Sequence, residues 1–258
     1  MILGAVTLAD ALGMKGDDVV ALVGGGGKTT AMFRLAREAV DGGRCAITTT
    51  TTHIFAAQIP LAPAHVLAAE ATRERVAAAL AAHRHVLVIG ATNPATARAA
   101  GPSLELFARL RDWFPDACIL NEADGSRMRP FKAPADHEPV IPPATTLVVP
   151  VVGADVLGQP LDDDHVHRPE LVAALTGAPR GAAVTPEILA TVLAHPQGGR
   201  KGVPPGARVV VVINKVDALA DPAPARETAT RLLREPAIHA VVLTAVRAPS
   251  PVLEIHTR

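Results

Sequence analysis

The 258-residue chain is poor in aromatic residues and carries no excess of charge of either sign. Aromatic residues make up 2% of it and tyrosine is absent, which argues against the base-stacking surfaces that hold single-stranded nucleic acid. Its 25 basic residues are balanced by 25 acidic ones, so no overall positive field attracts it to phosphate backbones or acidic membranes. We therefore expect neither nucleic acid nor a membrane as its partner.

Cysteine is also scarce, with one residue at position 45 and one at position 118. Each lies at the start of an apolar run, so we expect two buried thiols and no disulfide. The N-terminal segment MILGAVTLADALGMKGDD lacks a basic flank and reaches acidic residues early, which is typical of neither a secretion signal nor a membrane span. These features predict a cytoplasmic protein.

Short apolar runs alternate with helical segments along the chain, as in a parallel sheet that is buried on both faces. The expected strands are Val19–Val23, Cys45–Thr49, His85–Ile89, Ala117–Asn121, Thr146–Val151, Arg208–Ile213 and Ala240–Leu243. The expected helices are Thr30–Val40, Thr72–Ala82, Ser103–Arg111, Pro169–Leu175 and Pro186–His195. The length and the apolar content predict a single α/β domain over residues 1–258.

Two proline-containing stretches, residues 128–143 and 153–169, interrupt this alternation. Dense proline prevents regular helix, and long ordered loops are commonly functional. We predict that both stretches are site loops over the carboxyl edge of the sheet. The alternative is that they are mobile surface linkers.

A strand, a glycine turn, a lysine and an amphipathic helix follow one another in the segment VVALVGGGGKTTAMFRLAREA. Glycines let backbone N–H groups point at phosphate oxygens, the lysine reaches the outer phosphates, and the first threonine can ligate magnesium. The full P-loop pattern has glycine where this chain has Leu22, so the match is to the shorter form GxxGKT. The predicted nucleotide-binding residues are Gly24, Gly25, Gly26, Gly27, Lys28, Thr29 and Thr30. The sequence therefore predicts a P-loop NTPase with a mostly parallel sheet flanked by helices.

Two carboxylates, Glu122 and Asp124, follow an expected strand in the segment NEADGSR. Ligands of open α/β sheets bind at the carboxyl ends of the strands, next to the glycine turn. We expect one or both carboxylates, together with Thr29, to hold Mg²⁺ directly or through water. An ordinary acidic turn is the alternative.

The late segment VVVVINKVDAL contains the pattern NKxD directly after an expected strand. Asp217 would accept hydrogen bonds from guanine, while the stem of Lys215 packs on the base and Asn214 completes the motif. Adenine lacks that pair of donors, so the pattern favours GTP. A backbone N–H from residues 243–245 is a further candidate contact to the base.

Several polar residues lie near these motifs in the sequence. Either a carboxylate, Glu122 or Asp124, or Thr52 is expected to orient the attacking water, and Arg127 is a candidate for stabilising charge in the transition state. A solvated basic loop is the alternative for Arg127. The candidate substrate or partner residues are His53, Lys132, His137, His167, Arg168 and Glu170. His165 and His167 form an HxH pair that could ligate a transition metal, although such pairs are common.

In their order, GGGGKTT, ExxG and NKxD resemble the signatures of the GTPases that deliver nickel or cobalamin to enzymes. That resemblance implies GTP hydrolysis coupled to insertion of a metal or cofactor, and pairing of two chains as a homodimer. The loop without glycine at position 22 is also similar to that of Mur-type ATP-dependent ligases, which leaves ATP open.

The strings VGGGGKTT, TTTTHIF, NEADGSRMRPFKAPADHEPVIP and HVHRPE, with the late INKVD, resemble the YqeC family of accessory proteins of selenium-dependent molybdenum hydroxylases. This resemblance covers most of the chain. It implies a role in handling selenium or the pterin cofactor, with the hydroxylase or its cofactor-handling proteins as partners.

We therefore expect a slow Mg²⁺-dependent NTPase, with GTP favoured over ATP, that serves maturation of a molybdenum enzyme. An ATP-dependent ligase or kinase acting on a small substrate is the second hypothesis. A nucleotide-gated carrier of the cofactor, without productive hydrolysis, is the third.

Overall fold

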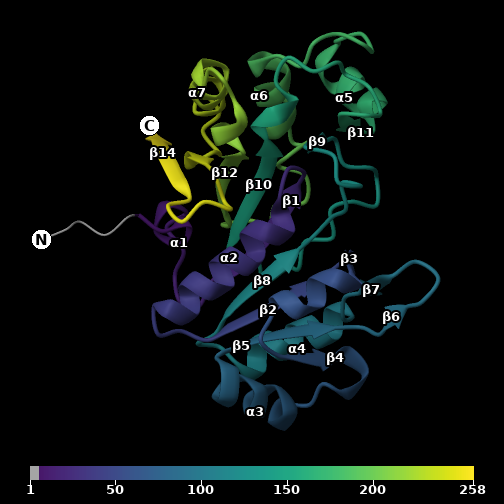
Figure 1. Cartoon of the computed structure of the whole chain (residues 1–258), viewed down its shortest axis with the longest axis vertical. Helices are drawn as coiled ribbons and strands as arrows, with labels where there is room; N and C mark the ends of the chain where they lie inside the picture. The colour runs from purple at the N-terminus through teal and green to yellow at the C-terminus, as the bar shows by residue number, and fades with distance from the viewer. Residues whose placement is uncertain (1–5) are drawn as a thin grey trace, which may run out of the picture.

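The computed structural model describes residues 6–258 and is built around one nine-stranded sheet (Figure 1). Its strands are β1 (Val19–Gly24), β2 (Ala46–Thr50), β4 (His65–Leu67), β5 (His85–Ile89), β8 (Cys118–Glu122), β10 (Leu147–Gly153), β12 (Arg208–Asn214), β13 (Ala240–Thr244) and β14 (Val252–Thr257). They are ordered β14-β13-β12-β10-β1-β8-β2-β5-β4, and only the β13–β14 pair is antiparallel. The predicted α/β class with a mostly parallel sheet is therefore confirmed.

Helices cover both faces of this sheet. They are α1 (Leu8–Ala11), α2 (Lys28–Asp41), α3 (Arg73–His83), α4 (Leu104–Trp113), α5 (Pro169–Thr176), α6 (Pro186–Ala194) and α7 (Ala223–Leu232). Leu22 packs in the core formed with α1 and α2, whereas its neighbours Ala21 and Val23 face the opposite side. On that side, α3 and α4 pack on β2, β5 and β8, and α6 and α7 pack on β10, β12 and β13. Burial of both faces explains why the strands read as continuous apolar runs.

The helix starts follow from the sequence. The hydroxyls of Thr72 and Ser103 accept hydrogen bonds from backbone N–H groups three residues later, at 3.3 and 3.2 Å, and so cap α3 and α4. Pro169 and Pro186 occupy the first turns of α5 and α6, where the missing N–H is harmless. All five predicted helices and seven predicted strands are present, although α2 begins two residues earlier than predicted, at Lys28.

Two small sheets lie outside the main one. The first pairs β3 (His53–Phe55), β7 (Arg98–Ala100) and β6 (Thr92–Asn93) in antiparallel fashion. The second pairs β9 (Phe131–Lys132) with β11 (Val166–His167) in parallel, so it joins the two proline-containing loops to one another. The loops thus carry short strands that the sequence did not predict.

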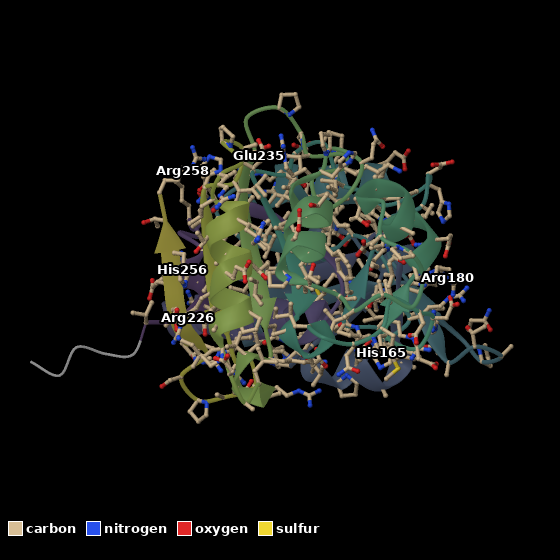
Figure 2. The ribbon with its side chains drawn as sticks, turned by 90° about the horizontal axis from the view of Figure 1, so that it is seen from above. His165, Arg180, Arg226, Glu235, His256 and Arg258 are labelled. Atoms are coloured by element: carbon tan, nitrogen blue, oxygen red, sulfur yellow. The ribbon has the colours of Figure 1, made fainter. Side chains whose placement is uncertain are left out.

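The connection between β10 and α6 and the C-terminal strand lie on opposite sides of the protein. From above, His165 and Arg180 are on one side, and His256 on β14 is on the other (Figure 2). Cys45 and Cys118 are free thiols; Cys118 is buried, as predicted, whereas Cys45 is partly exposed. Among residues 6–258 there is no helix long and apolar enough to cross a membrane.

Candidate functional site

Steric constraints on the turn between β1 and α2 are clearest at Gly24 and Gly26. Gly24 has φ +95° and Gly26 has φ +71°, a region that L-residues rarely adopt. A Cβ atom at Gly24 would collide with the carbonyl oxygen of Val151, and one at Gly26 with the backbone of Gly153. Leu22, where the full P-loop pattern has glycine, is instead buried within β1. The turn therefore opens at Gly24, as the shorter pattern predicts.

Lys28 is the first residue of α2 and its side chain is 3% exposed. Its ammonium donates to the Gly24 carbonyl at 2.5 Å, so the side chain curls over the turn. The same nitrogen lies 3.3 Å from Asp124 and 3.7 Å from Glu122. The lysine is thus held at the turn by oxygen atoms that phosphate oxygens could replace.

Thr29 and Glu122 are brought together because β8, which ends at Glu122, lies directly beside β1. The Thr29 hydroxyl donates to the Glu122 carboxylate at 2.6 Å. Burial raises the pKa of Glu122, and it outweighs the opposing effects of Lys28 and of the Thr29 hydrogen bond. A hydroxyl and a carboxylate in contact are oxygen donors of the kind that Mg²⁺ takes in proteins, so these residues fit the predicted ion.

The carboxylate of Asp124 points into the protein and not into the open cavity. Its two oxygens accept hydrogen bonds from the backbone N–H of Gly24 at 3.0 and 3.1 Å, and one of them lies 3.0 Å from the ammonium of Lys132. The residue is 2% exposed. Asp124 therefore shapes the turn through these contacts, while Glu122 is the carboxylate that lines the open cavity.

From Asp124, ion pairs continue into both proline-containing loops. Lys132 contacts the carboxylate of Glu138 at 2.5 Å, and Arg168 contacts the same oxygen at 2.6 Å. Burial alone would raise the pKa of Glu138, but its hydrogen bonds to Arg168 and Lys132 and their charges lower the pKa to about 2. We call this series of contacting side chains the ion-pair chain; its members are Lys28, Asp124, Lys132, Glu138 and Arg168. It links the glycine turn to the residue that precedes α5.

The other candidates in these loops have different surroundings. Burial, followed by the charges of Arg168, Lys132 and Arg127, lowers the pKa of His167 to about 4. His137 and Glu170 are exposed. His165 contacts the carboxylate of Asp162 at 2.8 Å, but within residues 6–258 no three His, Cys, Asp or Glu side chains converge as a metal-binding group.

The threonines at the end of β2 and directly after it mostly hold the carboxyl edge of the sheet. Thr49 and Thr50 donate to the backbone carbonyls of Val88 and Glu122, and Thr51 donates to Val140. Thr52 is half-buried and lies near Gly125, and His53 is exposed on β3. Of the threonines Thr49 to Thr52, Thr52 is the one whose hydroxyl makes no hydrogen bond to the residues that the structure describes.

A cavity of about 300 Å³ opens at the glycine turn. Its lining includes six lysine and arginine side chains and a single carboxylate, that of Glu122. The basic side chains are Lys28, Arg98, Arg127, Arg129, Lys215 and Arg247. Arg127 follows Gly125 with φ +49°, a strained conformation for a non-glycine residue of the kind that is frequent at functional sites. This distribution of charge suits a polyanion.

Sequence reasoning missed Arg98 and Arg247 as site residues. Arg98 reaches the cavity because β7 pairs with β3, and its guanidinium lies 4.7 Å from the ring of Phe55. Arg247 reaches it from the loop after β13. Neither belongs to a motif, so no signal in a single sequence could have identified them.

The NKxD segment lies at the end of β12, and Asn214 contacts the turn. Its amide donates to the Gly26 carbonyl at 2.8 Å and accepts from the Val246 N–H at 3.0 Å. Lys215 lines the cavity and contacts Asp155 at 2.6 Å, and Asp217 is exposed in the 3₁₀ turn η4 (Val216–Ala218). Asn214 thus connects the glycine turn with the loop that would lie beside a bound base.

Of the expected N–H donors at residues 243–245, Leu243 and Thr244 lie within β13 and are fully buried, and Ala245 donates to the Pro251 carbonyl at 2.8 Å. Val246 donates to Asn214. A backbone contact to a base from this loop would therefore come from residues beyond position 246.

Together these elements define an α/β protein with a glycine turn, a lysine and a buried carboxylate at the carboxyl edge of a parallel sheet. The family model described as YqeC protein matches residues 20–170. The chain is also 32% identical over 222 residues to "Uncharacterized protein YqeC" of Escherichia coli (strain K12), a match that covers 78% of this chain and 77% of that protein. The chain belongs to the YqeC family. The range matched by the family model includes the glycine turn, Glu122 and both loops, and it ends before Asn214.

Proposed function

We propose that the protein binds a nucleoside triphosphate with Mg²⁺ in the cavity at the glycine turn. The observation that carries this proposal is the convergence of Lys28, Thr29 and Glu122 at the floor of a strongly basic cavity. The backbone of residues 24–28 and the Lys28 ammonium would bind the phosphates, while Thr29 and Glu122 would hold the ion. The bound ion would neutralise part of the phosphate charge.

Hydrolysis in such a site would depend on positioning and electrostatics. Arg127 lines the cavity and would stabilise charge that develops on the transferred phosphate. Thr52, with its free hydroxyl near Gly125, is the candidate for orienting water. We expect slow turnover, because a partner would complete the site.

Guanine is the preferred base in this proposal. The support is the NKxD pattern, in which Asn214 already ties the end of β12 to the glycine turn and leaves Asp217 free at the surface. Titration calorimetry with GTP and ATP in magnesium tests this preference. Tight binding of GTP that moves to XTP in Asp217→Asn supports guanine reading, whereas a preference for ATP, or no effect of the substitution, overturns it. Asp112→Asn, at an exposed position on α4, is the matched control.

The role that we propose is that of an accessory factor in the maturation of a selenium-dependent molybdenum hydroxylase. The support is the family resemblance in the central segments of the chain, all within the range matched by the YqeC model. Co-purification of the tagged protein with the hydroxylase, with and without GTP, tests it. Retention of full hydroxylase activity in cells that lack this protein would contradict the role.

A nucleotide-gated carrier is the second candidate, and the ion-pair chain favours it. If phosphate oxygens bound Lys28, its ammonium would move away from Asp124. The ion-pair chain would pass this change on to both loops through Lys132, Glu138 and Arg168. Gating requires that the partner binds the diphosphate and triphosphate forms with different affinities. Measured partner affinity that changes between GDP and a non-hydrolysable GTP analogue, without phosphate release, would favour the carrier.

A further inference from the structure

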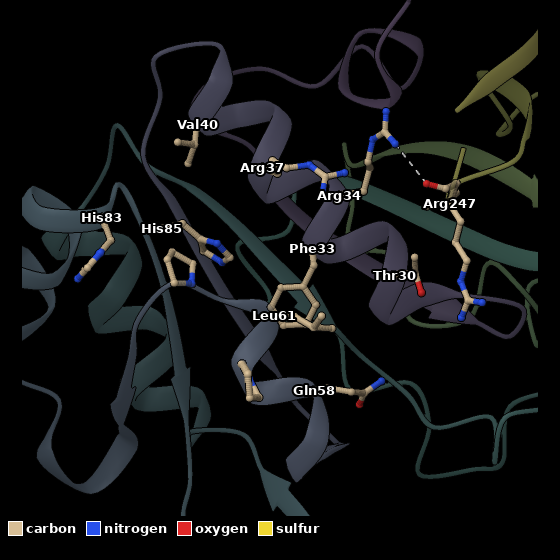
Figure 3. A pocket seen from close by; sticks show the side chains of 13 residues that line it. Thr30, Phe33, Arg34, Arg37, Val40, Gln58, Leu61, His83, His85 and Arg247 are labelled. Atoms are coloured by element: carbon tan, nitrogen blue, oxygen red, sulfur yellow. Dashed lines mark hydrogen bonds between the residues drawn. The ribbon is translucent and has the colours of Figure 1, made fainter. Parts of the chain in front are cut away.

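A second and larger cavity, of about 790 Å³, runs along the outer side of α2 (Figure 3). One wall is the helix stripe that contains Thr30, Phe33, Arg37 and Val40. The other is formed by η1 (Ala56–Leu61), the last residue of α3 and the first residue of β5. We call this cavity the α2 groove. Its volume lies within the range of ligand pockets, about 300–1,000 Å³.

The α2 groove has a built wall at the end near the glycine turn. The guanidinium of Arg34 pairs with Glu38 at 2.6 Å and donates to the carbonyls of Ala248 and Pro249 at 2.7 and 2.8 Å. These contacts fix the loop after β13 against α2, and this loop contributes Val246 to the groove. Arg34 is therefore structural, and the shape of this end does not depend on a ligand.

The charge of the α2 groove is positive. Its lining includes the arginines at positions 34, 37 and 247, of which Arg34 is paired with Glu38, and among the described residues it includes no aspartate or glutamate. Arg37 and Arg247 are exposed and make no hydrogen bond or ion pair to residues 6–258. Two guanidinium groups without protein partners among the described residues, both in the lining of one cavity, favour an anionic ligand.

The body of the α2 groove is apolar. Phe33 and the buried His85 form its floor, with ring centroids 6.1 Å apart, and Leu61 lies across from Phe33 on η1 (Figure 3). His85 bonds through Nε2 to Thr48 at 2.9 Å, and its Nδ1 has no partner in the part of the chain that the structure describes. Leu61 is 57% exposed, so its apolar side chain is accessible to a ligand in the groove.

The α2 groove meets the cavity at the glycine turn. Thr30, Gln58 and Arg247 line both cavities. A molecule that lies in the groove can therefore place one end beside a bound triphosphate.

We propose that the α2 groove binds a small organic anion with an apolar ring system. We further propose that nucleotide binding in the neighbouring cavity changes the affinity for this anion. Arg37 would pair with its acidic group, and Phe33 and Leu61 would enclose its ring system. The second half of this proposal rests on the proposed nucleotide-binding function, whereas binding of the anion does not.

The probe for the first half is 1-anilinonaphthalene-8-sulfonate, which joins a sulfonate to an apolar ring system, with N-phenyl-1-naphthylamine as its uncharged analogue. In nucleotide-free protein we expect saturable binding of one sulfonate probe per chain by fluorescence and calorimetry. Arg37→Glu should weaken this binding about tenfold or more and leave the uncharged analogue within twofold. Leu61→Asn should weaken both.

The matched control is Arg73→Glu, which reverses an exposed arginine at the start of α3, outside the groove lining. It should change probe affinity less than twofold. All three substitutions are at exposed positions, and urea denaturation checks that they are folded. Affinity that is unchanged in Arg37→Glu, or reduced equally in Arg73→Glu, would overturn the proposal.

Saturating Mg-GTP tests the second half. Because Thr30, Gln58 and Arg247 line both cavities, we expect the nucleotide to change the affinity for the sulfonate probe at least threefold. Unchanged probe affinity in protein that demonstrably binds Mg-GTP would overturn the link between the two sites. If calorimetry shows no nucleotide binding at all, the proposed function fails, and the second half fails with it, while the results with Arg37→Glu still decide whether the groove binds anions.

Discussion

Replacement of Glu138 by glutamine should destabilise the protein and change the shape of its acid unfolding. Glutamine keeps the size of the side chain but removes the charge that holds Lys132 and Arg168 together. The pKa of Glu138 is lowered from 4.5 to about 2 in the folded protein, which corresponds to at most about 3 kcal/mol. Because the side chain is 15% exposed, solvent screening reduces the expected loss to roughly 2 kcal/mol.

The loss of stability in Glu138→Gln should depend on pH. A carboxylate whose pKa is lowered by folding contributes its full stability above the pKa of the unfolded chain, here 4.5, and the contribution disappears as the pH falls through about 2. The difference in unfolding free energy between wild type and Glu138→Gln should therefore be constant from pH 7 to about pH 5 and fall to about half by pH 3.

Urea denaturation at pH 7, 5, 4 and 3 measures this difference. Glu70→Gln removes one partner of an exposed ion pair with Arg75, so as the control it should cost less than about 1 kcal/mol. A loss in Glu138→Gln that is as small as the control, or that does not shrink between pH 5 and pH 3, would refute the role of the ion-pair chain in stability.

Four further predictions follow from the site. Gly26→Ala, which must place a side chain against Gly153 at a positive φ, should abolish both the turn and nucleotide binding, as seen in calorimetry. Lys28→Met should weaken triphosphate binding about a hundredfold or more in the same assay while the circular dichroism spectrum is retained. Asn214→Ala breaks buried hydrogen bonds that include one to the glycine turn, so its urea midpoint should report a loss of about 2–4 kcal/mol. Burial lowers the pKa of His85 from 6.5 to about 4, so between these two pH values the unfolded chain binds a proton that the folded protein does not. The free energy of unfolding should therefore fall as the pH is lowered through this range, and His85→Gln should make that fall smaller in urea denaturation.

The main sheet was predictable because its strands are buried on both faces. Continuous valine and isoleucine runs between helical segments identified seven of its nine strands, and hydroxyl caps at Thr72 and Ser103 located two helix starts. The strands that were missed lie at the edges. β14 alternates exposed and half-buried residues in the segment VLEIHT, and β4 is three residues long, so neither resembles the interior strands. α7, in the segment APARETATRL, was also missed, because it contains a proline and half of its residues are polar.

The candidate site was predictable where it follows strand order and local pattern. Glu122 approaches Thr29 because β8, which ends at Glu122, lies next to β1, which leads into the glycine turn. The inward orientation of Asp124 was not predictable, because it depends on Lys132 in a loop that folds back over the turn. Arg98 and Arg247 reach the cavity through tertiary placement alone.

Backbone hydrogen bonds join the glycine turn to β10 and to the two proline-containing loops. The backbone N–H groups of Gly25 and Gly26 donate to the carbonyls of Val151 and Arg129, and Gly153 donates to the carbonyl of Pro130. N–H groups that would otherwise point at phosphate are therefore partly bonded to the loops. In the proposed nucleotide site, a bound triphosphate would compete with these carbonyls for the N–H groups and with Asp124 for Lys28, which would couple nucleotide binding to loop position. Because such coupling is reciprocal, a partner that binds the loops would then change the affinity for nucleotide by the same factor as the nucleotide changes the affinity for the partner.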